Sequence, residues 1–211
     1  MDDLIRAAEQ LLPAGVALGA AEPRAAPSGL WAGENLGPVV PKRLAEYAAG
    51  RRAARAALRK LGVAECAIPS SADRAPVWPN GIVGSISHTD SACLSIVSKE
   101  SQWMGLGIDI ELARPMEPEI AASILVPKDS VSRQNVLSPT IIFAAKEAVY
   151  KAQYPITKLL FGFDTLGVSL AADQFTARFL TPQGQFRAGD EIRGRWAIAG
   201  GHLIVIAAIP P

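Results

Sequence analysis

The sequence predicts an α+β fold, and three observations support this class. Clear helical patterns occupy residues 41–61 and 140–153. Short alternating strands follow one another near 82–87 and 92–98, and again between 166 and 209. Turn signals at Asn80-Gly81 and Gly200-Gly201 fit hairpins between such strands. Each half of the chain therefore combines a helix-bearing segment with antiparallel strands.

The first half contains the most regular helix. Residues 2–12 predict a short amphipathic helix, 16–18 a short strand and 20–40 a loop rich in Ala, Pro and Gly. The helix over 41–61 begins at Pro41 and stops at Gly62. Four of its arginines recur at spacings of four or eight residues and form a basic stripe: Arg43, Arg51, Arg55 and Arg59. A basic stripe of this kind is ordinarily solvated. The strands at 82–87 and 92–98 follow, joined by a turn over 88–91.

A second unit begins at Trp103. It opens with a strand through 105–111, continues with a short helix near 117–124 and reaches the helix over 140–153, which Pro155 is expected to end. Phe143 and Tyr150 are seven apart on one face and are expected to anchor this helix in the core. Four strands complete the unit, near 166–170, 175–180, 193–199 and 203–209.

Composition excludes several classes of protein. The 211 residues are 49% hydrophobic with a mean hydropathy of +0.20, enough for one large domain or two small ones. A net charge of +1 argues against a general nucleic-acid binder or a membrane-surface binder. Cys66 and Cys93 have neither metal-ligand spacing nor a disulfide framework, which fits a cytoplasmic protein. No signal peptide or transmembrane stretch is expected.

Three carboxylates predict a cation site. Asp109 and Glu111 alternate with isoleucines on a strand, so both point to one side. Glu147, on the later helix, could close the site, and Lys151 lies one turn beyond it. Oxygen ligands of this kind suit Mg²⁺ with phosphate oxygens as further ligands. The simpler interpretation is an acidic strand edge and a surface Glu–Lys pair.

Four segments in this order resemble one family. They are K-R-x-x-E-Y-A-A-G-R-x-A-A-R-x-A-L at 42–58, W-P-x-G-x-x-G-S-x-S-H-T at 78–89, G-I-D-I-E at 107–111 and F-A-A-K-E-A-x-Y-K at 143–151. Together they resemble the larger, single-chain class of 4'-phosphopantetheinyl transferases, the type that activates surfactin and enterobactin synthetases. Ala144 stands where the family often has Ser.

The resemblance implies a fold and an activity. The family fold is a pseudo-dimer of two similar halves with the active site between them, here residues 1–104 and 105–211. The reaction moves the phosphopantetheine arm of coenzyme A to a serine of an apo carrier protein and releases adenosine 3',5'-bisphosphate. Acyl, peptidyl and aryl carriers are all candidates. The enzyme would then activate synthases of secondary metabolites or siderophores. A monomer is the expected state, with no nucleic-acid or membrane partner.

The resemblance also assigns roles to residues. Mg²⁺, with Mn²⁺ as the alternative, would be held by Asp109, Glu111 and Glu147. Asp109, Glu147 and Lys151 would be catalytic, Lys151 helping the leaving group. Glu147 or a water on the metal would take the serine proton. Coenzyme A contacts are expected at seven positions: Arg43, Arg51, Arg74, Ser87, His88, Lys146 and Lys151. Of these, Arg43, Arg51, Ser87 and His88 would hold the 3'-phosphate.

Other interpretations remain open at this point. The segment 112–140, with Lys128 and Arg133 among apolar residues, is the candidate carrier-docking surface. A Mg²⁺-dependent phosphoester hydrolase acting on a nucleotide or coenzyme A would need the same three carboxylates but no carrier. A non-catalytic module that binds carriers or coenzyme A would not need clustered acids. Nucleic-acid binding is the most distant alternative, because aromatic residues are not interleaved with the basic helix.

Overall fold

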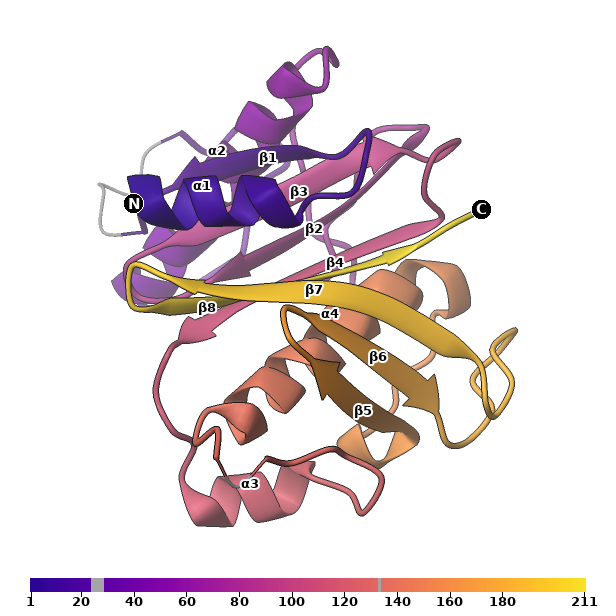
Figure 1. Cartoon of the computed structure of the whole chain (residues 1–211). Coiled ribbons are helices and arrows are strands. Elements are labelled where there is room, and N and C mark those ends of the chain that lie inside the picture. The colour runs from indigo at the N-terminus through magenta and orange to yellow at the C-terminus, as the bar shows by residue number, and fades with distance from the viewer. Residues whose placement is uncertain (24–28, 133) are drawn as a thin grey trace.

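The computed structural model describes residues 1–23, 29–132 and 134–211, and it confirms the α+β class. Two antiparallel sheets form its framework (Figure 1). The smaller sheet has the strand order β1-β3-β2, with bounds Ala17–Ala21, Cys93–Lys99 and Ile82–His88. The larger sheet has the order β4-β8-β7-β6-β5, with bounds Gly105–Leu112, His202–Ile209, Glu191–Ala199, Gln174–Phe179 and Leu166–Ala171.

Helices cover these sheets. In the described ranges they are α1 (Asp2–Leu11), α2 (Pro41–Lys60), α3 (Pro118–Ile124) and α4 (Ser138–Thr157), with a 3₁₀ turn at Phe163–Thr165. Helix α2 packs on β1 and β3, and α4 packs on β4 and β8. Helix α1 lies across β7 of the larger sheet (Figure 1). None of the described helices is both long and apolar enough to cross a membrane.

The two sheets meet where β2 lies beside β4. No backbone ladder joins these strands, and serine hydroxyls connect them instead. The N–H of Ile108 donates to Ser85 Oγ at 3.1 Å, and the N–H of Ile110 donates to Ser87 Oγ at 3.2 Å. One apolar cluster also spans the seam, since Leu4 of α1 packs in it with residues of both sheets. The division into 1–104 and 105–211 stays a prediction.

Helix α4 lies in direct contact with the backbone of β4. A Cβ atom on Gly105 would lie 2.1 Å from the carbonyl oxygen of Ala152, and one on Gly107 would lie 1.8 Å from that of Ala148. Both distances are far below any real contact, so only glycine allows this approach. In the smaller sheet, Gly19 of β1 lies equally close to α2, where a Cβ would meet the Ala53 carbonyl oxygen at 2.0 Å.

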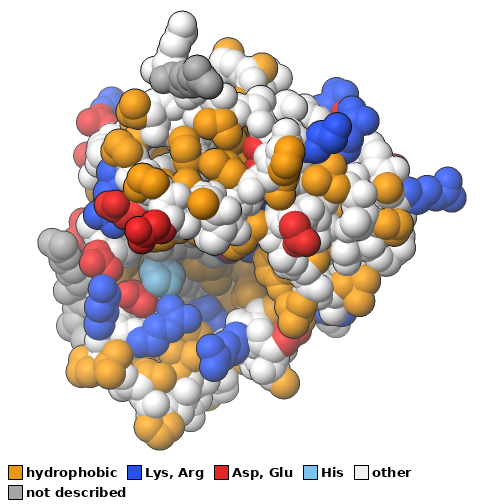
Figure 2. All heavy atoms as spheres, turned by 90° about the horizontal axis from the view of Figure 1, so that it is seen from below, with side chains coloured by type: hydrophobic (Ala, Val, Ile, Leu, Met, Phe, Trp, Pro, Cys, Tyr) orange, Lys and Arg blue, Asp and Glu red, His pale blue; other side chains and the backbone are white. Residues whose placement is uncertain are grey.

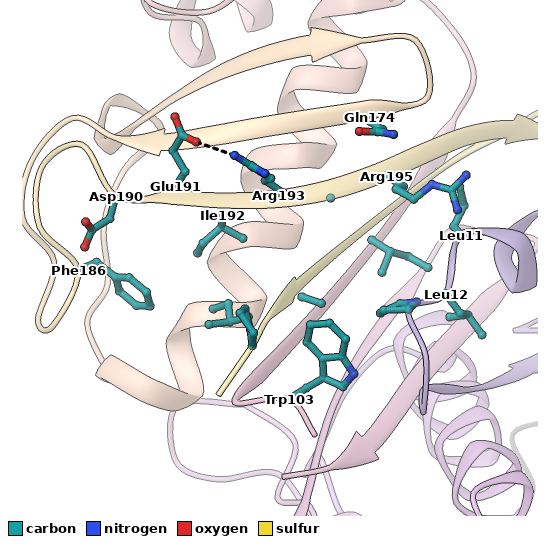
Figure 3. A pocket seen from close by; sticks show the side chains of 16 residues that line it. Leu11, Leu12, Trp103, Gln174, Phe186, Asp190, Glu191, Ile192, Arg193 and Arg195 are labelled. Carbon is teal, nitrogen blue, oxygen red and sulfur yellow. Dashed lines mark ion pairs between the residues drawn. The ribbon is translucent and has the colours of Figure 1, made fainter. Parts of the chain in front are cut away.

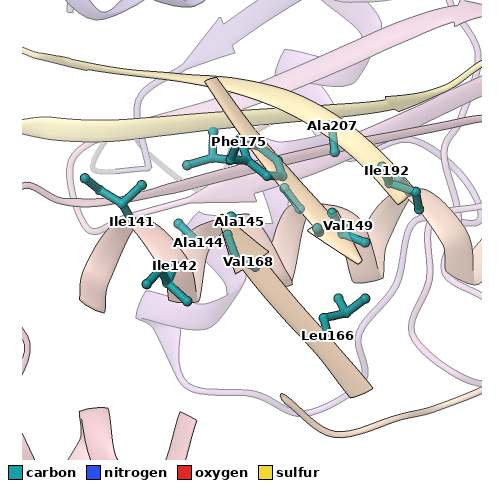
Figure 4. Packing of buried hydrophobic residues seen from close by; sticks show 14 of the residues in the cluster. Ile141, Ile142, Ala144, Ala145, Val149, Leu166, Val168, Phe175, Ile192 and Ala207 are labelled. Atoms are coloured by element: carbon teal, nitrogen blue, oxygen red, sulfur yellow. The ribbon is translucent and has the colours of Figure 1, made fainter. Parts of the chain in front are cut away.

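The same face of this helix also packs into the larger core. Ile141, Ala145 and Val149 of α4 lie against Val168 of β5 and Phe175 of β6 (Figure 4). The predicted anchors are half-buried: Tyr150 packs against Phe161, which borders the larger core, and Phe143 packs against Phe163. Small residues occupy the core side of α4 because larger ones would hold it away from β4.

One expectation about the helices is wrong. Helix α4 continues through Pro155 to Thr157 and ends at Lys158 in the left-handed conformation, with φ of 56°. Proline removes one backbone donor, and so close to the helix end the lost hydrogen bond does not stop the helix. The basic stripe on α2 is not fully solvated, since Arg51 and Arg55 are buried. Arg55 is paired there with the buried carboxylate of Glu34.

Replacement of Gly107 by Ala tests the contact between β4 and α4. The new methyl group must push the strand and helix apart, and overpacking of this kind costs about 1–3 kcal/mol. We expect Gly107→Ala to lower the midpoint of urea unfolding clearly. Ser169→Ala, at an exposed strand position, serves as the control and should change stability by less than about 0.5 kcal/mol. Equal midpoints for the two variants would contradict the packing argument.

Candidate functional site

Three predicted residues come together at the seam between the sheets. Asp109 of β4 accepts a hydrogen bond from Lys151 Nζ of α4 at 2.6 Å and another from Ser87 Oγ of β2 at 2.9 Å. Lys151 Nζ also lies 3.2 Å from Ser87 Oγ and donates to the Ile108 carbonyl oxygen at 3.2 Å. Two strands and one helix thus converge on one carboxylate, which is 4% exposed.

Ser87 has a different position from the one predicted. Its hydroxyl was expected to bind a phosphate together with His88. The structure buries it against Asp109 and Lys151, where it also accepts the Ile110 N–H. Adjacent strand residues point to opposite sides, so the Ser87 and His88 side chains diverge. The expected hydroxyl contact with the phosphate is therefore not supported, and Ser87 acts on the carboxylate instead.

The other two carboxylates share the electrostatic environment of Asp109. Burial, followed by the charges of Asp109 and Glu147, raises the pKa of Glu111 to about 7. Burial also raises the pKa of Glu147, while Lys151 opposes the shift. The ammonium of Lys151 therefore does not offset the combined effect of burial and repulsion on these two groups.

The chemistry of these residues fits a divalent cation, although the site is not preassembled. Asp109 Oδ2 is buried and has no hydrogen-bond partner among the described residues. Carboxylate oxygens are the ligands that Mg²⁺ prefers. Within the described ranges, however, no three Asp, Glu, His or Cys side chains are spaced to hold a metal. Glu111 or Glu147 would have to move toward Asp109 Oδ2 to complete such a site.

A second cluster gathers at the far end of β2. Arg43 Nη1 of α2 donates to His88 Nε2 at 3.1 Å and lies 3.3 Å from Glu46 Oε2. His88 Nε2 lies 3.9 Å from the same carboxylate oxygen. Burial lowers the pKa of His88, against the opposing effect of Glu46. The structure thus brings Arg43 and His88 together, as a shared phosphate site requires.

Two other predicted arginines lie apart from this cluster. Arg51 is 6% exposed, and it donates to the Ile68 carbonyl oxygen and to Ser70 Oγ, each at 2.8 Å. A phosphate contact would require these bonds to break. Arg74 is exposed on a loop that the Asp73 carboxylate fastens to α4 through the Tyr154 hydroxyl.

The predicted phosphate contact of Lys146 is wrong for this structure. Its ammonium is 1% exposed and donates to the Ile124 and Phe163 carbonyl oxygens, each at 3.0 Å. The third acceptor is Asp129 Oδ2 at 2.9 Å. An ammonium has three donors, and all of them are used here. Lys146 therefore fastens the segment around Asp129 to α4 and does not face solvent.

The sequence analysis missed Glu46 and Asp129. Glu46 lies three residues after Arg43 on one helix, and this spacing could have indicated the pair. Asp129 is bound to Lys146 across seventeen positions of sequence, and no local pattern indicates such a partner.

Cavities add one pocket to the site. A hollow on one face contains a histidine and is bordered by acidic and basic side chains (Figure 2). A pocket of about 190 Å³ lies next to Glu147 and is lined mainly by Tyr150, Leu160 and Phe161. A larger groove of about 830 Å³ lies elsewhere, between the end of α1, Trp103 and strand β7 (Figure 3). None of the predicted site residues lines this groove.

Two family models and several curated proteins match this chain. The model of the 4'-phosphopantetheinyl transferase N-terminal domain matches residues 34–98, and that of the 4'-phosphopantetheinyl transferase superfamily matches residues 105–200. The 4'-phosphopantetheinyl transferase Svp of Streptomyces mobaraensis is 36% identical over 81% of this chain and 74% of its own length. Enterobactin synthase component D of Salmonella typhi is 36% identical over 79% of this chain and 72% of its own.

A mycobacterial relative matches to a similar extent. The 4'-phosphopantetheinyl transferase PptT of Mycobacterium tuberculosis is 31% identical over 81% of this chain and 80% of its own length. The first match contains Ser87 and the second contains Asp109 and Lys151, so residues of both matches meet at the seam. The chain therefore belongs to the 4'-phosphopantetheinyl transferases.

Proposed function

We propose that this enzyme transfers the phosphopantetheine arm of coenzyme A to a serine of an apo acyl, peptidyl or aryl carrier protein, and that it requires Mg²⁺. The observation that carries the proposal is the cluster of Asp109, Lys151 and Ser87 at the seam, with Glu111 and Glu147 beside it. Such a cluster suits a pyrophosphate, because phosphoryl transfer depends mainly on positioning and charge neutralisation.

The residues divide the chemical work. The carrier serine oxygen forms a bond to the β-phosphorus, and the bond from that phosphorus to the bridging oxygen breaks, releasing adenosine 3',5'-bisphosphate. Lys151, whose side chain is 27% exposed, would exchange one of its three present acceptors for the departing α-phosphate. Glu147 accepts the serine proton. Asp109, with Glu111 and Glu147, would hold Mg²⁺, which supplies charge neutralisation at the pyrophosphate.

The remaining parts of coenzyme A have candidate contacts. Arg43 and His88 bind the 3'-phosphate. Arg43 presents donors at the end of β2, and His88, which accepts from Arg43 in this structure, would donate to the phosphate once its ring is protonated. Arg74, which is exposed on its loop, stays the proposed contact for the nucleotide. The pocket beside Glu147, lined by Tyr150 and Phe161, suits the apolar part of the arm.

The carrier docks against the segment between β4 and α4. Lys128 is exposed there and can meet the acidic residues of a carrier. Arg133, the other basic residue expected on this surface, lies outside the described residues. Lys146 keeps this segment beside the active helix through its bond to Asp129.

Mass measurement of apo carriers tests the reaction directly. Incubated with coenzyme A and Mg²⁺, the wild type should add one phosphopantetheine to a carrier. Asp109→Asn and Glu147→Gln should slow this by at least about 100-fold, as expected for lost electrostatic stabilisation. Glu191→Gln, which removes an exposed carboxylate on β7, is the control and should act like wild type. Consumption of coenzyme A without a carrier would instead identify a hydrolase.

The raised pKa of Glu111 predicts a pH-dependent stability. Its ordinary value is 4.5 and its folded value is about 7, so the folded protein binds more protons between these pH values. Stability of the metal-free protein should therefore fall as pH rises from about 4.5 to about 7, and Glu111→Gln should reduce this fall. Thermal melts at pH 5 and pH 8 measure it. Mg²⁺ at pH 8 should raise the wild-type Tm more than that of Glu111→Gln, and equal shifts would exclude Glu111 as a ligand.

His88 predicts the pH dependence of coenzyme A binding. Burial lowers its pKa in the free protein, and a bound phosphate would raise it again. Affinity gained from the protonated ring should therefore fall as pH rises between these two values. Calorimetry from pH 5.5 to 8.5 should show the advantage of wild type over His88→Ala shrinking. Ionisation of the 3'-phosphate affects both proteins alike, so a constant ratio would argue against His88.

A further inference from the structure

His202 connects the two hairpin turns that approach each other across the seam. It begins β8, directly after the Gly200-Gly201 turn. Its Nδ1 lies 2.9 Å from the Gly200 carbonyl oxygen, which can only accept, so Nδ1 carries the proton. In the neutral ring Nε2 is then an acceptor for two hydroxyls, Ser91 Oγ at 3.0 Å and Thr89 Oγ1 at 3.2 Å. Both hydroxyls belong to the turn between β2 and β3.

This turn has bonds of its own. Thr89 N–H donates to the Ala92 carbonyl oxygen at 2.8 Å. Thr89 Oγ1 accepts the N–H groups of Ser91 at 3.4 Å and Ala92 at 3.3 Å. Lys42 of α2 pairs with Asp90 at 2.7 Å, which ties the turn to its own half. The turn should therefore keep its fold without His202, and what it would lose is a tie to the larger sheet.

The position of this turn gives His202 a role in the site. Thr89 directly follows His88, whose ring meets Arg43 at 3.1 Å. We propose that His202 is a positioning residue for the 3'-phosphate of coenzyme A: by holding Thr89 and Ser91, it fixes the end of β2 and with it the His88 ring. This inference rests on the proposed function. It also means that the larger sheet contributes to a phosphate site built from the smaller one.

Comparison of two ligands isolates this role from general stability. Coenzyme A and 3'-dephospho-coenzyme A differ in the phosphate that His88 would bind. Loss of one or two net hydrogen bonds, each about 1 kcal/mol, corresponds to roughly a 5- to 30-fold change in affinity. We expect His202→Ala to weaken coenzyme A binding within this range by calorimetry, and to leave 3'-dephospho-coenzyme A binding within about twofold of wild type. In turnover, KM for coenzyme A should rise with little change in kcat.

Three further variants complete the test. His202→Gln keeps a donor and an acceptor and should restore most of the affinity. Ser91→Ala removes one of the two hydroxyls and should produce a smaller loss of the same selectivity, which also covers the case in which His202→Ala is unstable. Ile198→Ala, at an exposed position of the same hairpin, should bind both ligands like wild type.

Other outcomes would overturn the proposal. Equal loss for both ligands would show that His202 only supports the fold, and unchanged coenzyme A affinity in His202→Ala would show that it does not position His88. A wild type that binds coenzyme A but does not distinguish it from the dephospho form would remove the phosphate site and this inference, while leaving transfer to the carrier intact. A wild type that binds neither ligand would overturn the proposed function as well.

Discussion

The arrangement of Asp109, Lys151 and Ser87 depends on the backbone contact between β4 and α4. Gly105 and Gly107 have no Cβ, and the helix lies where those atoms would be. Alternation then places Asp109 on the same side of the strand, two residues further along. Because the helix is so close, Lys151 Nζ lies 2.6 Å from Asp109 Oδ1, while the Lys151 side chain remains 27% exposed. The two glycines of this strand thus set how closely α4 approaches it. The contact between Lys151 and Asp109 depends on that approach.

The second constraint is that side chains, and no backbone ladder, join strands β2 and β4 of the two sheets. Ser85 and Ser87 connect β2 to β4, and His202 connects the turns at one end of these strands. Ser87 serves two purposes, since the same hydroxyl accepts a backbone N–H and donates to Asp109. Movement between the halves would therefore disturb the carboxylate directly. A site shared in this way depends on the seam for its geometry, and its stability and its chemistry are linked.

Local patterns were enough for most of the fold, and for part of the site. Turn signals such as Gly200-Gly201 and strand alternation predicted the hairpins, because both depend on neighbours in sequence. The burial of Arg51 could not be predicted, since its partners at 68 and 70 belong to an irregular segment. The same holds for Lys146, whose motif position suggested a phosphate contact while a distant Asp129 encloses it. Periodicity predicts which face of a helix or strand a residue occupies. It does not predict which distant residues pack against that face.

Charge balance explains why the acidic cluster suits its proposed ligand. Asp109, Glu111 and Glu147 face one nearby ammonium, that of Lys151, and burial reduces the help that water can give. Burial first, and then the charges of Asp109 and Glu147, raise the pKa of Glu111 to about 7. A divalent cation would supply the missing positive charge, and a pyrophosphate would then bring its own negative charge to that cation and to Lys151. The unpartnered Asp109 Oδ2 marks where such a cation would first be held. The excess negative charge would therefore favour binding of the cation, and the pyrophosphate would bind more readily once the cation is present.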